Sequence, residues 1–280
     1  MKKIITVCAL TLICCAPSFA WGRIAHAAIN KIAEDHLTKT AAAAVSNIMG
    51  GESIVTFASY PDDARDRLNA NFKPDWNKAY KGYGHTYEVD ENYWPYHGID
   101  CNGRYVTNAL YFIEGFEQDL RQAAERPDTA NFIDLVMLCH FIADMHCPGH
   151  VRYQPKRDIA NKFKVNYQGR GEIVYHGVWD DVYPEDLFPW SYSDYAAMCD
   201  IKSKSEIAGI IKGDIYDWGR ETAIVSLPVR KDMHQGSVID SNWKLDNADL
   251  LRSQIRNAGY RLAHELNMLF DAKYAKKHKK

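Results

Sequence analysis

Residues 131–150 read NFIDLVMLCHFIADMHCPGH, and this stretch decides the fold. Apolar side chains occupy nearly every side of the helix that residues 131–147 would form, which is typical of a helix buried in a core. Pro148 indicates that this helix ends by about Cys147. The stretch therefore predicts a buried helix in a domain large enough to have a sizeable core.

The same stretch carries two polar residues that a buried helix does not readily hold. His140 and Asp144 are four residues apart, so on a helix they lie on one face and can reach one ion. A charged aspartate in an apolar helix is costly unless it is paired or bound to a metal. A buried His–Asp hydrogen bond and a pair of metal ligands both meet this requirement. His150 follows the predicted helix end and can point elsewhere.

Three further segments have the periodicity of helices with one apolar face: residues 24–37, 107–125 and 247–275. Alternating strand patterns are scarce, so we expect a mainly α fold in a single domain. Gly259 lies inside the last of these helices, where glycine costs about 1 kcal/mol relative to alanine, and this predicts close packing there. Residues 72–104 are expected to be irregular, with a short hairpin near Gly82–Val89. The basic tail, residues 273–280, is expected to be a solvated, frayed end.

The N-terminal residues 1–20, MKKIITVCALTLICCAPSFA, have the organisation of a signal peptide. Two lysines precede an apolar run over residues 4–15, and small residues stand before a predicted cut after Ala20. The apolar run is too short for a typical membrane span. We therefore expect an exported protein, periplasmic or extracellular, without stable membrane insertion and with a mature chain of residues 21–280.

The charge of the chain argues against a general binder of polyanions. The formal net charge is −2, and without Lys2 and Lys3 it becomes −4 over residues 21–280. Bulk positive charge therefore does not attract nucleic acid to this chain, and bound metal ions would have to do so.

Four cysteines lie beyond the predicted cut: Cys101, Cys139, Cys147 and Cys199. An exported protein can oxidise its cysteines, and four of them allow three complete pairings among which the sequence does not choose. A cysteine-ligated metal is less favoured, because this part of the chain contains no CxxC-type pair.

Further candidate metal ligands are spread over the chain: His26, Asp62, Asp63, His85, His150, His176 and Asp180. Each of them alone has an ordinary explanation as a surface or core residue. The histidine and aspartate of HGVWD, residues 176–180, repeat the four-residue spacing seen at 140 and 144. Nitrogen and carboxylate ligands in such numbers suit zinc and exceed what one ion can use, so the sequence predicts a multinuclear zinc site.

The motifs, in their order along the chain, resemble those of the S1/P1 nuclease family, which is related to bacterial phospholipase C. They are WGRIAH at 21–26, YPDDAR at 60–65, the loop around His85, HFIADMHCPGH at 140–150, HGVWD at 176–180 and QIRNAGYRLAHELN at 254–267. The resemblance covers nearly all of residues 21–280. It implies one catalytic domain with the phospholipase C/P1 nuclease-like helical fold and long irregular loops.

The resemblance also implies three zinc ions per chain. One ion would be held by Asp62, His85, His140 and Asp144. A second would be held by the Trp21 α-amino nitrogen and carbonyl oxygen, His26 and Asp144, and a third by His150, His176 and Asp180. Asp62 is preferred to Asp63 because it keeps a three-residue step to Arg65, which matches the family arginine that contacts the phosphate.

The implied activity is hydrolysis of single-stranded DNA and RNA to 5′-nucleotides, with 3′-nucleotidase activity. A hydroxide bridging two zinc ions would attack phosphorus, with Asp144 as the bridging carboxylate and Arg65 as a clamp on the phosphate. The partner would be single-stranded nucleic acid or a nucleotide, and the chain is expected to be a monomer. Tyr87 is a candidate for stacking on a base, with Tyr83 and Trp94 as alternatives.

Two other functions are kept as alternatives. A phospholipase C acting on phosphocholine lipids is disfavoured by the short step from Trp21 to His26 and by the last ligand pair, which lacks the glutamate of the phospholipases. A zinc-storing or structural protein is disfavoured by Arg65, since a storage site needs no phosphate clamp. His146 is expected to be a core residue or to support the ligands from behind.

Overall fold

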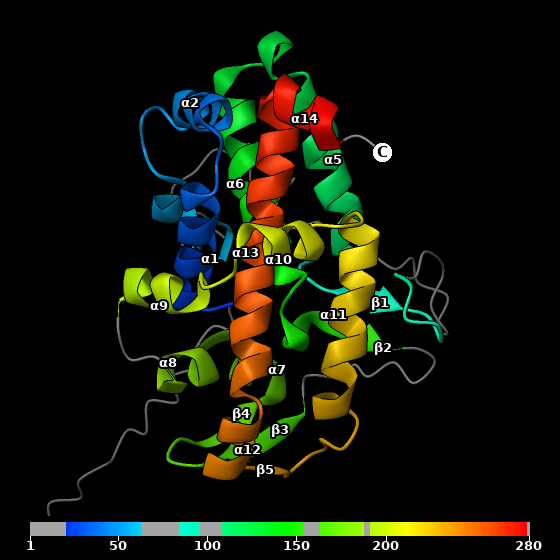
Figure 1. Cartoon of the computed structure of the whole chain (residues 1–280). Coiled ribbons are helices and arrows are strands. Elements are labelled where there is room, and N and C mark those ends of the chain that lie inside the picture. Colours follow the sequence, from blue (N-terminus) through cyan, green and yellow to red (C-terminus); the bar gives the residue numbers. More distant parts are fainter. Residues whose placement is uncertain (1–20, 63–83, 96–107, 154–162, 188–190, 279–280) are drawn as a thin grey trace, which may run out of the picture.

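The computed structural model describes residues 21–62, 84–95, 108–153, 163–187 and 191–278. Its axis is the long helix α13 (Ala248–Phe270), which runs through the middle of the molecule in Figure 1. Helices α1 (Arg23–Asp35) and α6 (Asp128–Asp144) both pack against α13. Every residue of α6 from Asp134 to Asp144 is buried, which confirms the predicted buried helix.

The remaining helices surround these three in a mainly α architecture, as predicted. Helix α5 (Ala109–Arg121) packs along α6, and α2 (Lys39–Ile48) contacts α13 and α6. The later helices are α7 (Tyr175–Gly177), α8 (Tyr183–Leu187), α9 (Tyr192–Cys199), α10 (Lys204–Ile210), α11 (Ile215–Arg230), α12 (Ser241–Asp246) and α14 (Ala272–His278). Short 3₁₀ turns cover Ile54–Phe57, Ala123–Glu125 and Pro148–His150, and a π-helical turn covers Val178–Val182.

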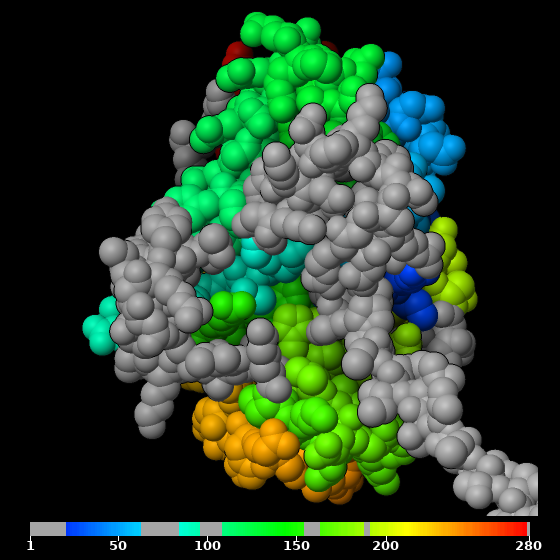
Figure 2. All heavy atoms as spheres, turned by 180° about the vertical axis from the view of Figure 1, so that it is seen from behind, coloured from blue at the N-terminus to red at the C-terminus, as the bar shows by residue number. Residues whose placement is uncertain are grey.

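Two small sheets complete the described fold. Strand β1 (Tyr87–Val89) pairs in parallel with β2 (Val151–Tyr153), with Tyr87 opposite Val151. Strands β4 (Gly171–Val174), β3 (Lys164–Tyr167) and β5 (Val238–Ile239) form the second sheet in that order. From the opposite side, the segment after α11, in orange, lies beside the green residues of this sheet at the lower end of the molecule (Figure 2).

Two local expectations differ from the structure. The predicted hairpin near Gly82–Val89 is not seen within residues 84–89, where β1 pairs in parallel with the distant strand β2. Val89 also forms an antiparallel bridge with Pro95, and Gly82 and Tyr83 lie outside the described residues. The single helix predicted over residues 247–275 breaks at Asp271, whose backbone is extended and whose carboxylate accepts from Lys273 N at 2.9 Å. The tail is therefore helical up to His278, as α14, instead of frayed.

The contact between α1 and α13 is as close as the glycine in α13 predicts. A Cβ on Gly259 would lie 2.6 Å from Ile32 Cβ and 3.1 Å from the carbonyl oxygen of Ile29. Both of these residues are fully buried on α1. The absence of a side chain at position 259 therefore allows α1 and α13 to approach this closely.

Substitution Gly259→Ala is expected to lower the free energy of unfolding by about 1–3 kcal/mol, because the added methyl group overlaps Ile32. Gly115→Ala is the matched control, since a Cβ there would meet no atom within 4 Å on the exposed side of α5. The control should gain up to about 1 kcal/mol from helix propensity. Urea unfolding of both variants measures the difference, and equal stabilisation of the two would contradict the close contact.

Candidate metal centre

The centre is built around the C-terminal end of α6, where His140 and Asp144 are both fully buried. Their four-residue spacing places His140 Nε2 3.1 Å from Asp144 Oδ2, as the helical period predicts. The other ring nitrogen of His140, Nδ1, donates to the carbonyl oxygen of Ala58 at 2.9 Å. This backbone contact fixes the ring and leaves Nε2 directed at the carboxylate, which is the usual arrangement of a metal-binding histidine.

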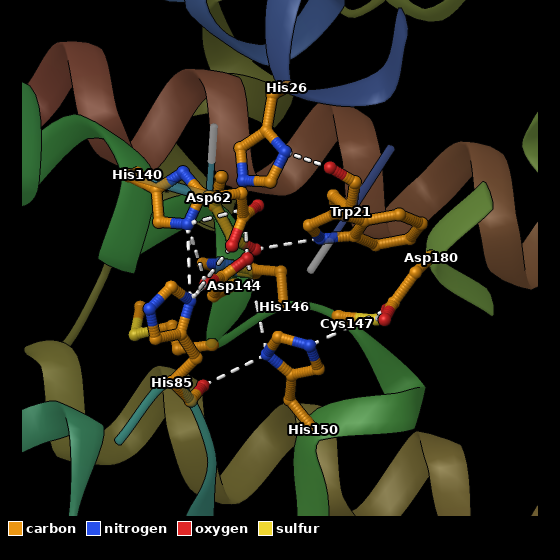
Figure 3. A network of polar contacts seen from close by, with 12 residues as sticks. Trp21, His26, Asp62, His85, His140, Asp144, His146, Cys147, His150 and Asp180 are labelled. Atoms are coloured by element: carbon orange, nitrogen blue, oxygen red, sulfur yellow. Dashed lines mark hydrogen bonds and ion pairs between the residues drawn. The ribbon is translucent and has the colours of Figure 1, made fainter. Parts of the chain in front are cut away.

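Asp62 and His85 meet this pair from two other parts of the chain (Figure 3). His85 Nδ1 lies 2.9 Å from Asp144 Oδ2 and 3.2 Å from His140 Nε2. Asp62 Oδ2 lies 3.5 Å from His140 Nε2, and its Oδ1 lies 3.6 Å from His85 Nδ1. The four residues predicted for one ion therefore lie close together, with His140 in contact with each of the other three.

The second predicted set approaches the other oxygen of Asp144. His26 Nε2 lies 3.2 Å from Asp144 Oδ1, and the His26 ring stacks on that of His140 with centroids 4.2 Å apart. His26 Nδ1 lies against the carbonyl oxygen of Trp21. Asp144 thus offers Oδ2 to one group of ligands and Oδ1 to another, which is the placement required of a bridging carboxylate.

Trp21 is held in place by its own side chain and by the glycine after it. The indole is fully buried and donates from Nε1 to the carbonyl oxygen of Ala143 at 2.8 Å. A Cβ on Gly22 would lie 2.8 Å from the carbonyl oxygen of Asp180 and 2.7 Å from Asp181 Oδ1. The backbone of residues 21 and 22 therefore packs closely between the end of α6 and the segment that carries Asp180.

The third predicted set lies where α7 passes into the π-helical turn. His176 Nε2 is 2.6 Å from Asp180 Oδ2, and His150 Nε2 is 3.4 Å from Asp180 Oδ1. The His150 and His176 rings have centroids 4.7 Å apart. Single π-turns inside helices are frequent at functional sites, and this one carries Asp180 itself.

The strand pair β1–β2 connects the first and third sets. His85 is two residues before β1 and His150 directly precedes β2. His150 Nδ1 donates to the carbonyl oxygen of His85 at 2.9 Å, which directs Nε2 of the same ring toward Asp180. The short parallel pairing of β1 with β2 thus brings together two histidines, His85 and His150, that are far apart in the sequence.

The charges of the centre favour cations. Burial acts to raise the pKa of Asp144, but His140 and His150 hold it well below its usual range. The pKa of Asp180 is also lowered: burial acts to raise it, but the effects of His176 and His150 are larger. Burial acts to lower the pKa of His140, yet Asp144 and Asp62 raise it to about 9. The carboxylates therefore stay anionic inside the protein and draw positive charge toward them.

Unused polar atoms fit a bound metal. Both carboxylate oxygens of Asp62, His26 Nε2 and His150 Nε2 are buried and make no hydrogen bond within the described part of the chain. Buried polar atoms without hydrogen bonds are rare in proteins, and each requires an explanation. Sets of ligand atoms close enough to share an ion include His26, Asp62 and His140, and also His85, His140 and Asp144. The donor set of imidazoles and carboxylates suits a divalent metal such as zinc.

Cys147 is a member of the centre that is not among the ligands predicted from the sequence. Its Sγ donates to Asp180 Oδ1 at 3.3 Å, and Cys147, His150 and Asp180 form a third set of atoms close enough to share an ion. Burial, then Asp180 and Asp144, raise the pKa of this thiol well above its usual range. Cys139, Cys147 and Cys199 are free thiols, and Cys101 lies outside the described residues. The spacing C-x-x-H at 147–150 is the signal that could have indicated this cysteine as a member of the centre.

Other predicted residues lie away from the centre or outside the described part. His146 is fully buried, donates from Nδ1 to Ile142 O at 2.8 Å and accepts from Arg261 at 3.0 Å, as expected for a core residue. Tyr87 is also fully buried, and its hydroxyl donates to Gly219 O at 2.9 Å, so its ring offers no surface to a base. Arg65, together with Asp63 and Tyr83, lies outside the described residues.

Comparisons with known proteins identify relatives of this chain. The family model described as S1/P1 Nuclease matches residues 21–271. The chain is 22% identical to Endonuclease 4 of Arabidopsis thaliana, over 91% of each chain. It is 22% identical to Endonuclease 2 of the same plant, over 96% of this chain and 98% of the relative. It is 23% identical to Nuclease S1 of Aspergillus oryzae, over 66% of this chain and 62% of that protein.

The family match begins at Trp21, spans all three sets of candidate ligands and ends at Asp271, directly before α14. The chain therefore belongs to the S1/P1 nuclease family and is a nuclease, a hydrolase that acts on phosphoester bonds.

Proposed function

We propose that residues 21–280 form an exported zinc-dependent nuclease that cleaves single-stranded DNA and RNA to 5′-nucleotides and also has 3′-nucleotidase activity. The observation that carries the proposal is the buried cluster of three carboxylates and five histidines with unused ligand atoms. A storage protein could share such a cluster, but the family of nucleases to which the chain belongs favours catalysis. Export is proposed from the signal peptide pattern of residues 1–20.

The ligands of three zinc ions are proposed as the sequence predicts them. They are Asp62, His85, His140 and Asp144; Trp21, His26 and Asp144; and His150, His176 and Asp180. Such ions, when bound, supply an activated water and neutralise charge on phosphate oxygens. Asp144 holds the first two sets together through its separate oxygens, which lie 3.1 Å from His140 and 3.2 Å from His26. Arg65 is proposed to clamp the phosphate.

The preference for single strands is proposed from the depth of the centre. His26, His140, His150 and Asp144 are fully buried, whereas His85 and His176 keep side-chain exposures of 13% and 21%. A phosphate in an intact duplex cannot easily reach groups recessed in this way, while a flexible single strand can bend toward them. Since the chain has no excess of positive charge, attraction of the phosphate is assigned to the ions.

The predicted cut after Ala20 is proposed to complete the second metal set. An α-amino group ordinarily titrates with a pKa of about 7.7–8.0, so a zinc ion can displace its proton near neutral pH. The buried Trp21 carbonyl oxygen already lies against His26. In an uncut chain the nitrogen of Trp21 is an amide and is not a ligand, so export and activation are coupled.

None of the described helices is long and apolar enough to cross a membrane.

A substrate panel tests the activity. Purified residues 21–280 should cleave single-stranded DNA and RNA, dephosphorylate a 3′-nucleotide and cleave duplex DNA more slowly. A chelator should abolish all cleavage, and metal analysis should return close to three zinc ions per chain, because the activity is assigned to them. Turnover of phosphatidylcholine alone would favour a phospholipase C. Bound zinc without cleavage of any substrate would favour a metal-binding protein.

A second prediction concerns the N-terminus. A chain that begins Met-Trp21, with the methionine retained as verified by mass, should stay folded but lose most activity and about one zinc ion. The physical reason is that the free amine moves one residue away from the chelating position. The control is the chain that begins at Trp21, compared by thermal unfolding, zinc content and cleavage of single-stranded DNA. Equal zinc content and activity in the two chains would show that the amine is not a ligand.

A further inference from the structure

The turn Cys147-Pro148-Gly149-His150 presents two side chains to the same carboxylate. His150 N donates to the carbonyl oxygen of Cys147 at 2.9 Å and closes a 3₁₀ turn. Cys147 Sγ lies 3.3 Å from Asp180 Oδ1, and His150 Nε2 lies 3.4 Å from the same oxygen. Figure 3 shows both side chains directed toward Asp180. Sulfur and nitrogen are thus placed side by side around one point.

A separate observation marks this point as a place for a ligand. His150 is fully buried, and its Nε2 makes no hydrogen bond within the described residues, although it faces Asp180. The ligand atoms of Cys147, His150 and Asp180 all lie within 4.8 Å of one another. Thiolate sulfur, imidazole nitrogen and carboxylate oxygen are the three donor types that zinc takes in proteins.

The glycine in the turn allows the turn to approach the opposite segment closely. A Cβ on Gly149 would lie 3.2 Å from the carbonyl oxygen of His176, 3.3 Å from Trp179 Cβ and 3.4 Å from Cys147 Sγ. The turn therefore packs directly on the segment that carries His176 and Asp180. Cys147 is fully buried, and its Sγ faces Asp180 inside this packed region.

We propose that Cys147 is a thiolate ligand of the third ion, together with His150, His176 and Asp180. This inference rests on the third metal site of the proposed function. On binding, the S–H bond breaks, the proton leaves to solvent and a sulfur–metal bond forms, with no change of oxidation state. Zinc with four protein ligands is tetrahedral, and zinc in catalytic sites can expand to five ligands, so a phosphate oxygen could still bind. The sulfur also makes this position the one most favourable to softer metals.

Cobalt substitution tests the proposal without reference to activity. The zinc of residues 21–280 is removed with a chelator and replaced by Co²⁺, whose bond to a thiolate gives a near-ultraviolet charge-transfer band. The wild-type protein and Cys139→Ser should both show the band, and Cys147→Ser should lack it. Cys139 is a matched control because it is also a buried free thiol but belongs to none of the ligand sets. Cys147→Ser should also bind one ion more weakly, by at least the roughly 10–100-fold that loss of an outer partner of a metal ligand costs.

A second variant keeps the test independent of the folding of Cys147→Ser. Replacement of Cys101, Cys139 and Cys199 by serine leaves Cys147 as the one cysteine after residue 20, and the band should persist in it. A wild-type protein that binds cobalt and cleaves single-stranded DNA but shows no band would overturn the cysteine assignment while the proposed function stands. A band lost in Cys139→Ser and kept in Cys147→Ser would overturn it as well. Failure to bind any cobalt would overturn both proposals.

Discussion

The burial of the Asp144 carboxylate is the constraint on which the rest of the centre depends. The group is fully buried and lies at the C-terminal end of α6, where the helix dipole is itself negative. Neither the helix nor the apolar core around it compensates this charge. Imidazoles surround the carboxylate instead: a ring nitrogen of each of His26, His85 and His140 lies within 3.2 Å of an Asp144 oxygen. A buried anion thus explains why residues so far apart in the sequence gather at one helix end.

The surrounding elements hold these side chains at the C-terminal end of α6. His26 is positioned by α1, whose close approach to α13 is allowed by the missing side chain of Gly259. His150 and His85 are positioned by the short pairing of β1 with β2 and by the hydrogen bond between them. Asp180 is positioned by a π-helical turn that packs against the backbone of Gly22. The residues of the centre thus depend on several tertiary contacts between elements that are remote in the sequence.

Features that depend on interactions between residues close in the sequence could be predicted, and features that depend on remote contacts could not. The buried α6, the stripe of α13 and the pairs at 140/144 and 176/180 are local, because helical periodicity places residues four apart on one face. The strand pairing that brings His85 to His150 has no such signal, since three residues show no periodicity and their partner is remote. Tyr87 resembles a loop aromatic open to a base, but its ring is enclosed by the core and its hydroxyl is bound to Gly219. Cys147 has no second cysteine at CxxC spacing, which is the usual sign of a metal-binding cysteine. The residue at that spacing is His150, and the two lie in the same group of possible ligands.

The same carboxylates set both the cost of the fold and its affinity for cations. Asp62, Asp144 and Asp180 are fully buried, and both oxygens of Asp62 make no hydrogen bond within the described residues. Buried acceptors without hydrogen bonds weaken a fold, and a cation that binds them only in the folded state would stabilise that state. Metal binding and folding are therefore linked in this chain. In the proposed function, ions bound in this way would also attract phosphate to a chain whose net charge is negative.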